Sequence, residues 1–227
     1  MSGAGEGGAG VSPRPGARTV AVGGGGPLRW RSGEPLGPLR ELMARAGILA
    51  IPTESSYGLG VDPRSAASVE AINRLKGRER GKPLPVVAAG RDQLATLPLG
   101  PLPVALERAM SLWPAPLSLV LPLAAALPAA AGGTTVAVRV PAHPLLRELL
   151  AALGTPLTAT SANAAGEAPA LAPDSVAALL AGADAAVVDG GTLPGGPPST
   201  LAAWEAGEWR VLRPGPVDLA ALRATLL

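Results

Sequence analysis

The highest concentration of charge in the chain lies at residues 74–82, Arg-Leu-Lys-Gly-Arg-Glu-Arg-Gly-Lys, with five cations and one anion. These residues follow a predicted helix, and Gly77 is suited to end it. Cations at a helix C-terminus complement the helix dipole, which is a structural role. The same cations on a loop could instead hold a polyphosphate. The segment is not a Walker A loop, because it is one residue short and lacks the Ser or Thr that holds magnesium.

Lysine is rare in this chain, which makes its positions informative. Only Lys76 and Lys82 are lysine among the 19 basic residues, and the only asparagines are Asn73 and Asn163. A compact ammonium and a planar guanidinium meet phosphate oxygens differently, so the two side chains are not interchangeable at such sites. Retention of lysine in an arginine-rich chain therefore indicates positions where an ammonium is needed, with chance retention as the alternative.

Hydroxyl groups follow or precede several predicted strands, in the segments 52–60 (PTESSYGLG), 158–163 (TATSAN) and 198–200 (PST). Open α/β sheets commonly bind ligands at strand ends. Hydroxyl and amide groups there can donate to phosphate or carboxylate oxygens. The alternative is that they form ordinary turns, in which Gly58 and Gly60 would supply positive φ angles.

Two charged or titratable residues stand out in apolar surroundings. Arg139 lies in an otherwise apolar strand and, if buried, needs a partner, either a protein carboxylate or an anionic ligand. His143, the only histidine, lies between Pro141 and Pro144 at a predicted helix start, where we expect it to cap or pack rather than catalyse. Ser161 lacks a nucleophile-elbow frame, so we expect no serine-hydrolase triad.

Composition excludes several classes of protein. The 227 residues are 48% hydrophobic, enough for one sizeable core. The absence of cysteine excludes a disulfide scaffold and a thiolate nucleophile, and with a single histidine it leaves no basis for a zinc site. The net charge of +2 gives no global field for nucleic acid. Ten of residues 1–26 are glycine, and we expect a disordered tail there.

Alternating helices and short strands are predicted for the remainder. The helices are predicted at 36–46, 65–76, 103–112, 144–153, 173–182 and 217–226, and the strands at 48–51, 84–88, 117–121, 134–140, 156–160, 185–189, 199–203 and 208–213. The uncharged stretch 109–138 is long enough to cross a bilayer, but four prolines interrupt it, so a buried strand and loop are expected. This pattern predicts one α/β (α+β) domain over 30–227, with a mixed, twisted sheet flanked by helices.

Seven short motifs occur in order at 52–59, 76–84, 113–117, 138–144, 160–163, 198–200 and 212–215. Together they resemble the YrdC/Sua5 family of L-threonylcarbamoyladenylate synthases, and their order is more specific than any one motif. Ser55 stands where the family commonly has Thr, Ala115 replaces a usual Gly, and Val87 occupies a position that is often His in longer, two-domain members. The resemblance implies the short, single-domain (TsaC-like) type.

The resemblance also implies a reaction, in which L-threonine, bicarbonate and ATP give threonylcarbamoyl-AMP and pyrophosphate for N6-threonylcarbamoyladenosine modification of tRNA position 37. By analogy, threonine would be bound by Ser55, Arg139, Ala159 and Ser199. ATP would be bound by Arg78, Lys82, Thr135, Ser161 and Arg213. Lys76 and Asn163 would complete a catalytic set with Arg78 and Ser161.

Cofactor and partners follow from the same resemblance. Mg²⁺ is expected to arrive with ATP, and no metal is expected on the side chains. The tRNA-threonylcarbamoyl transfer machinery is the expected partner, with weak RNA binding as a further expectation. The protein is expected to be cytoplasmic and to have no membrane contact.

Two alternatives stay open. One is a non-catalytic RNA-binding module of the same fold, and the other is a related carbamoyl or acyl transferase with a different acceptor pocket. Aromatic residues are 2% of the chain and do not alternate with the cations, which argues against single-strand stacking but not against shape-based duplex binding.

Overall fold

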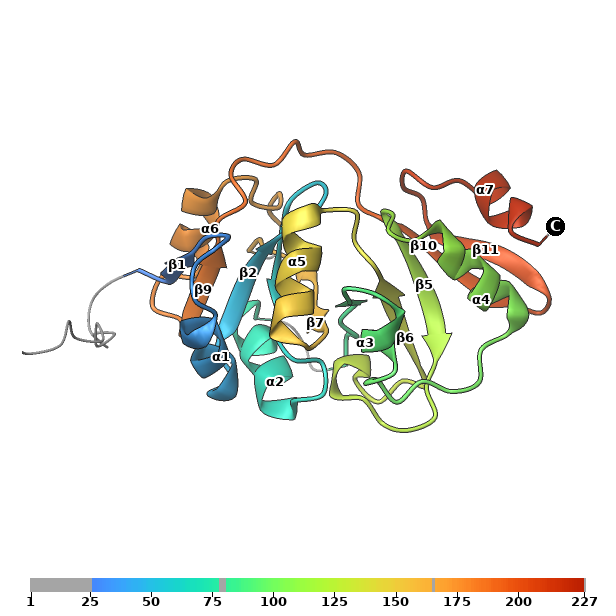
Figure 1. Cartoon of the computed structure of the whole chain (residues 1–227), viewed down its shortest axis with the longest axis horizontal. Helices are drawn as coiled ribbons and strands as arrows, with labels where there is room; N and C mark the ends of the chain where they lie inside the picture. The colour runs from blue at the N-terminus through green and yellow to red at the C-terminus, as the bar shows by residue number, and fades with distance from the viewer. Residues whose placement is uncertain (1–25, 78–80, 165, 227) are drawn as a thin grey trace, which may run out of the picture.

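The computed structural model describes residues 26–77, 81–164 and 166–226, so the predicted tail at 1–26 lies outside the described residues except for Gly26. Within these ranges eleven strands form two mixed sheets, with helices packed around them (Figure 1). The predicted α/β class is confirmed, but the strands divide between two sheets where one was expected. The first strand begins at Leu28, two residues before the predicted start of the domain.

The first sheet has the order β1-β9-β2-β3-β8. Its strands are β1 (Leu28–Trp30), β9 (Ala185–Val188), β2 (Ile48–Pro52), β3 (Tyr57–Gly60) and β8 (Thr160–Ser161). β1, β9 and β2 run parallel, whereas β3 is antiparallel to both of its neighbours. Every residue of β2, β3 and β9 is buried, which accounts for their continuous apolar sequence.

The second sheet has the order β11-β10-β5-β6-β4-β7. Its strands are β11 (Glu208–Arg213), β10 (Thr200–Glu205), β5 (Leu117–Pro122), β6 (Thr135–Arg139), β4 (Val86–Val87) and β7 (Leu157–Thr158). Only Ala159 separates β7 from β8, so the chain changes sheets at this residue. Thr158 and Val61 exchange bonds there: the Thr158 amide donates to the Val61 carbonyl at 2.8 Å, and the Val61 amide donates to the Thr158 hydroxyl at 3.1 Å.

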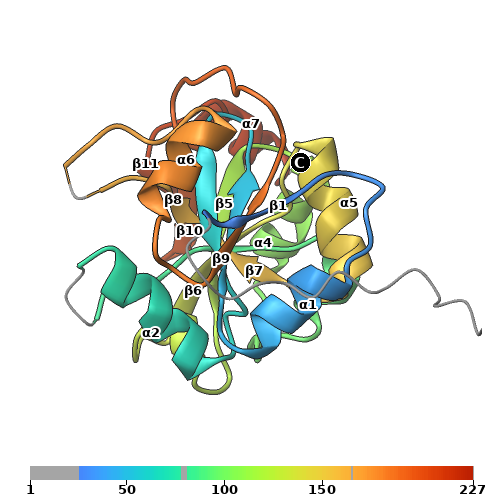
Figure 2. The ribbon, with the colours of Figure 1, turned by 90° about the vertical axis from the view of Figure 1, so that its left-hand side faces the viewer.

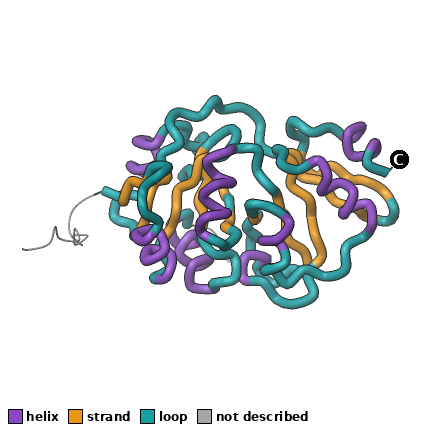
Figure 3. Tube along the Cα trace, in the orientation of Figure 1, coloured by secondary structure: helices purple, strands orange, loops and turns teal. Residues whose placement is uncertain are grey.

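Helices cover the outside of both sheets (Figure 3). They are α1 (Gly37–Ala44), α2 (Ala66–Leu75), α3 (Arg91–Leu94), α4 (Val104–Ala109), α5 (Pro144–Leu153), α6 (Pro173–Leu179) and α7 (Leu219–Ala224), with 3₁₀ turns η1 (Met110–Leu112) and η2 (Pro128–Ala130). In Figure 2, α6 lies at one end of the first sheet, and α1 and α2 lie together at the other end. Ser65 caps α2 by accepting from the Ser68 amide, and Gly154 ends α5 with a φ of 74°.

Two apolar clusters hold these layers together. The larger one runs through both sheets and includes Tyr57, Leu117 and Trp209. In the smaller one, side chains of α1 and α5 pack on β2, through residues such as Leu39, Leu146 and Leu49. Trp209 is buried in the larger cluster, and Trp113 and Trp204 pack against it.

The uncharged stretch 109–138 folds as η1, β5, η2 and most of β6. None of the helices in the described part of the chain combines the length and apolar character needed to span a membrane.

The alternative in which Gly58 and Gly60 supply positive φ angles in ordinary turns is wrong. Gly58 and Gly60 lie in β3 and neither has a positive φ. They are needed because the neighbouring backbone is close: a Cβ at Gly60 would lie 3.1 Å from the carbonyl oxygen of Thr158, and one at Gly58 would lie 3.3 Å from that of Thr160. Small residues therefore allow β3 to pack beside the point where the two sheets join.

Candidate functional site

Arg139 is the last residue of β6 and is 9% exposed, so its guanidinium needs a hydrogen-bonding partner. Its Nη1 donates to Glu54 Oε2 at 2.6 Å. The other carboxylate oxygen, Oε1, accepts from the backbone amide of Ala142 at 2.8 Å. Burial lowers the pKa of Arg139; the Glu54 carboxylate opposes this and the Arg213 guanidinium adds to it. The partner is a protein carboxylate, which sequence reasoning left open.

Ser199 and Arg213 lie together in the second sheet, Ser199 just before β10 and Arg213 at the end of the neighbouring strand β11. Arg213 Nη2 donates to Ser199 Oγ at 3.1 Å, and its Nε and Nη2 both reach the Ser199 carbonyl, at 3.1 and 2.9 Å. Ser199 Oγ also lies 3.0 Å from Oγ of Ser118, which is buried in β5. Since β5 lies between β10 and β6, Ser118 connects this pair to the strand of Arg139. Sequence reasoning missed Ser118; its only signal was a lone hydroxyl in an apolar strand.

Ser55 lies on the tight turn between β2 and β3. Thr53 closes this turn, because its amide and its hydroxyl both donate to the Ser56 carbonyl, at 3.1 and 2.7 Å. The Ser55 carbonyl accepts from the Gly195 amide at 2.9 Å. Glu54 is the neighbour of Ser55 on the turn, so the contact with Arg139 brings the end of the first sheet against the end of β6.

Lys76, Ser161 and Asn163 form one hydrogen-bonded cluster. Lys76 Nζ donates to the Ser161 carbonyl at 2.6 Å, to Asn163 Oδ1 at 2.9 Å and to the Asn163 carbonyl at 3.2 Å. Ser161 Oγ donates to the same Asn163 Oδ1 at 2.6 Å. The Ala162 amide donates to the Tyr57 carbonyl. The cluster therefore lies beside the start of β3, at the same end as the turn that carries Ser55.

Other predicted site residues lie further from Arg139. Thr135 begins β6 and is exposed; at about 3.3 Å per residue it is about 13 Å from Arg139 along the strand. Lys82 is exposed and precedes β4, whose parallel register with β6 places it toward the Thr135 end. Ala159 lies at the joint between the sheets and donates to the Pro85 carbonyl at 2.8 Å. Arg78 lies outside the described residues.

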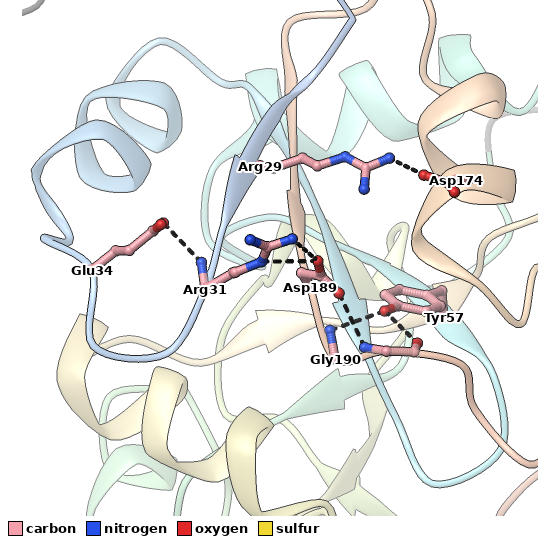
Figure 4. Close-up of polar contacts among 8 residues, drawn as sticks. Arg29, Arg31, Glu34, Tyr57, Asp174, Asp189 and Gly190 are labelled. Carbon is pink, nitrogen blue, oxygen red and sulfur yellow. Dashed lines mark hydrogen bonds and ion pairs between the residues drawn. The ribbon is translucent and has the colours of Figure 1, made fainter.

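The segment that carries Ser199 is anchored to the first sheet at its other end (Figure 4). The Tyr57 hydroxyl donates to the Gly191 carbonyl at 2.9 Å and accepts from the Gly190 amide at 3.0 Å. Asp189 accepts from Arg31 and from the Gly191 amide. From there residues 190–199 cross to β10 in the second sheet (Figure 1).

His143 lies at the start of α5. It occupies the N-cap position of α5, as predicted, but its side chain makes no capping hydrogen bond. Its Nδ1 is buried and has no hydrogen-bond partner in the part of the chain that the structure describes. Burial lowers the pKa of His143, and the Glu54 carboxylate opposes this. The predicted packing role fits these facts.

Among the described residues, no group of three or more histidine, aspartate or glutamate side chains is arranged to hold a metal ion. A cavity of about 430 Å³ lies between α3 and α4, and one of about 210 Å³ lies between α5 and residues 30–36. Neither is lined by a predicted site residue.

Comparison with known proteins identifies the family. The sequence model of the Sua5/YciO/YrdC family, described as "Telomere recombination", matches residues 41–215. The chain belongs to this family. The Sua5/YrdC resemblance predicted from the motifs is confirmed.

Two curated relatives carry the same name. The chain is 40% identical over 165 residues to a threonylcarbamoyl-AMP synthase of Thiobacillus denitrificans, a match that covers 72% of this chain and 87% of that protein. It is 39% identical over 189 residues to the threonylcarbamoyl-AMP synthase of Alkalilimnicola ehrlichii, covering 81% and 86%.

Solved structures of the Sua5/YciO/YrdC family share this fold. P. abyssi Sua5, in a structure complexed with L-threonine, matches with a TM-score of 0.74 at 30% identity, over 88% of this chain and 60% of that one. The chain thus spans about three-fifths of the length of that Sua5. E. coli YciO matches with a TM-score of 0.71 at 23% identity, over 86% and 98%, which supports the fold alone.

Proposed function

We propose that this chain is an L-threonylcarbamoyladenylate (threonylcarbamoyl-AMP) synthase, which makes threonylcarbamoyl-AMP and pyrophosphate from L-threonine, bicarbonate and ATP. One observation carries the proposal. Arg139, the Ser199–Arg213 pair and the turn with Ser55 come from different parts of the chain, yet they meet where the two sheets adjoin. The names of relatives at about 40% identity support the same activity.

Threonine is proposed to bind at the Arg139 end of this region. Arg139 Nε and Nη2 donate to no residue in the described ranges, and neither is among the buried polar atoms left without a partner, so both are open to a ligand. A guanidinium fork suits a carboxylate. The hydroxyls of Ser55 and Ser199 and the backbone at Ala159 would contact the rest of the amino acid.

ATP is proposed to bind across the Lys76 cluster and along the loop that ends at Lys82. Arg78, Lys82 and Arg213 would neutralise the triphosphate, and Ser161 and Thr135 would donate hydrogen bonds to it. Mg²⁺ is proposed to enter with the nucleotide and to supply further neutralisation of the triphosphate. Lys76 holds Ser161 and Asn163 in place through the bonds described above.

The chemistry requires positioning rather than an enzyme nucleophile. The threonine amine and bicarbonate form a carbamate with loss of water. A carbamate oxygen then attacks the α-phosphorus, and the bond from that phosphorus to the pyrophosphate oxygen breaks. Negative charge develops on the leaving pyrophosphate, where cations stabilise it. Loss of one such contact costs about 3 kcal/mol, or about a hundredfold in rate.

The proposed function also implies a partner enzyme and a cellular location. The adenylate is reactive and would be consumed by a separate enzyme that transfers the threonylcarbamoyl group to tRNA. A cytoplasmic location follows from that partner. Weak RNA binding to the basic residues 74–82 is kept as a secondary expectation.

Labelled bicarbonate tests the proposal directly. The purified chain is incubated with ATP and Mg²⁺, with and without L-threonine, and labelled adenylate and pyrophosphate are measured. The proposal expects both products only when threonine is present. Products that form equally without threonine would identify a different transferase, and RNA binding without any adenylate would favour the non-catalytic module.

A further inference from the structure

The turn between β2 and β3 presents a carboxylate to which no substrate role has been given. Glu54 lies between Thr53, which closes the turn, and Ser55, whose carbonyl is held by Gly195. The Glu54 side chain is 20% exposed. It extends from the first sheet to the end of β6 in the second. One short turn therefore carries both Ser55, which is proposed to contact threonine, and the partner of Arg139.

Both oxygens of the Glu54 carboxylate are in use. Oε2 accepts from Arg139 Nη1 at 2.6 Å, and Oε1 accepts from the Ala142 amide at 2.8 Å. A carboxylate held at two points cannot rotate without breaking a charge-assisted bond. It therefore fixes the position of one Arg139 nitrogen, while Nε and Nη2 form no bond within the described ranges.

Electrostatics gives the same carboxylate a second effect. Arg139 is buried, and Arg213 is close enough to disfavour its charge. Glu54 opposes both effects and so favours the charged form of Arg139 in this position. Without this carboxylate, the guanidinium would be driven to turn toward solvent and away from Arg213.

We propose that Glu54 is the positioning residue of the amino-acid site: it holds the Arg139 guanidinium so that Nε and Nη2 face the carboxylate of the amino-acid substrate. This inference rests on the proposed function, since it names what orients the arginine of that site. Glu54 acts through Arg139 and contacts no reacting atom.

Glu54→Gln is the variant that tests this role. Glutamine has the same shape but only one acceptor oxygen, so its NH₂ group must face either Arg139 or the Ala142 amide, both of which are donors. One of the two bonds is lost and the guanidinium is released. The KM for L-threonine should rise about tenfold to a hundredfold, while the KM for ATP stays within about twofold.

L-Threonine amide separates positioning from a general loss of structure. It lacks the carboxylate, so the natural chain should use it much less well than L-threonine. If Glu54 orients Arg139, Glu54→Gln should lose most of this preference, because the KM for threonine rises and that for the amide does not. A purely structural role would raise both KM values alike and leave their ratio unchanged.

Asp184→Asn is the matched control. It removes the carboxylate of another ion pair, that of Asp184 with Arg45, in which both side chains are half-exposed. Asp184 directly precedes β9, at the end of that strand away from Asp189. Its KM values should equal those of the natural chain. If Glu54→Gln does not fold, judged by circular dichroism, Glu54→Asp keeps the charge at a shorter reach and is measured in the same way.

The outcomes are distinguishable. If the natural chain forms no threonine-dependent adenylate, the proposed function fails and this inference fails with it. If the natural chain is active but the folded Glu54 variant keeps its preference for threonine over the amide, the proposed function stands and the positioning role of Glu54 is overturned.

Discussion

Tyr57→Phe removes a single hydroxyl, which joins β3 of the first sheet to residues 190 and 191. Tyr57 is the only tyrosine of the chain, and its side chain is fully buried. The hydroxyl bonds to both Gly190 and Gly191, at the start of the segment that runs to Ser199. Phenylalanine keeps the ring in the larger apolar cluster and leaves one backbone amide and one carbonyl without this partner.

The size of the effect follows from these two bonds. Each contributes about 0.5–1.5 kcal/mol net, so the free energy of unfolding should fall by about 1–3 kcal/mol. For a chain of this length, 1 kcal/mol corresponds to about 2–4 °C in Tm, which predicts a decrease of about 2–12 °C. Ser111→Ala is the control, because it removes an exposed bond of 2.6 Å to the Arg108 carbonyl, shorter than either Tyr57 bond, and should change Tm little.

The same residue predicts a pH dependence. Burial raises the pKa of Tyr57 above its usual 10, the Gly190 amide opposes this, and the nearby Asp189 adds to it. Above about pH 10 the unfolded chain loses the phenol proton while the folded chain keeps it, so stability falls as pH rises through that range. Tyr57→Phe should lack this loss.

Chemical denaturation at neutral and alkaline pH measures both effects, and the ultraviolet absorbance of phenolate reports this one tyrosine directly. A normal phenol pKa in the folded chain, or an unchanged Tm in the variant, would refute the argument.

Three further substitutions test other parts of the structure. Lys82→Ala should lower threonine-dependent adenylate formation about a hundredfold. Tm should not change, because the residue is exposed; a large fall in Tm would instead indicate a structural role. Burial lowers the pKa of His143, so below about pH 6.5 the unfolded chain binds a proton that the folded chain does not, and the free energy of unfolding falls. His143→Gln should make the free energy of unfolding depend less on pH between about pH 7 and 5. Gly60→Ala should lower that free energy by about 1–3 kcal/mol in urea denaturation, since its Cβ would lie 3.1 Å from a carbonyl oxygen, whereas an unchanged value would show that β3 can shift.

Elements marked by local chemistry were predictable from sequence. The helix α5 has the predicted bounds, because Pro144 favours its start and Gly154 ends it in the left-handed region. The strand β3 was missed, because the Gly residues that let it pack closely carry none of the side chains by which a strand is recognised. The predicted strand 156–160 is in fact β7 and β8, in different sheets, and nothing local at Ala159 marks that change.

Contacts over long sequence separations could not be assigned in advance. Burial of Arg139 predicted that it needs a partner, but Glu54 lies 85 residues away in the chain, and only the joining of two sheets brings it near. The position of Arg213 beside Ser199 likewise depends on the register of β10 and β11. Sequence reasoning can identify a group that needs a partner; the fold decides which partner is within reach.

The retention of lysine at position 76 now has a geometric explanation. Its Nζ reaches three oxygens of Ser161 and Asn163 from one point, at 2.6, 2.9 and 3.2 Å. Three tetrahedral donors on one nitrogen suit acceptors that surround that point, whereas the donors of a guanidinium lie in a plane and spread over a larger area. All other basic residues of this chain except Lys82 are arginine, so the lysine at position 76 coincides with a place where a compact ammonium fits the acceptors. Lys82 is exposed, and its ammonium forms no hydrogen bond with another residue in the described ranges, so we expect it to serve a bound ligand, as proposed above.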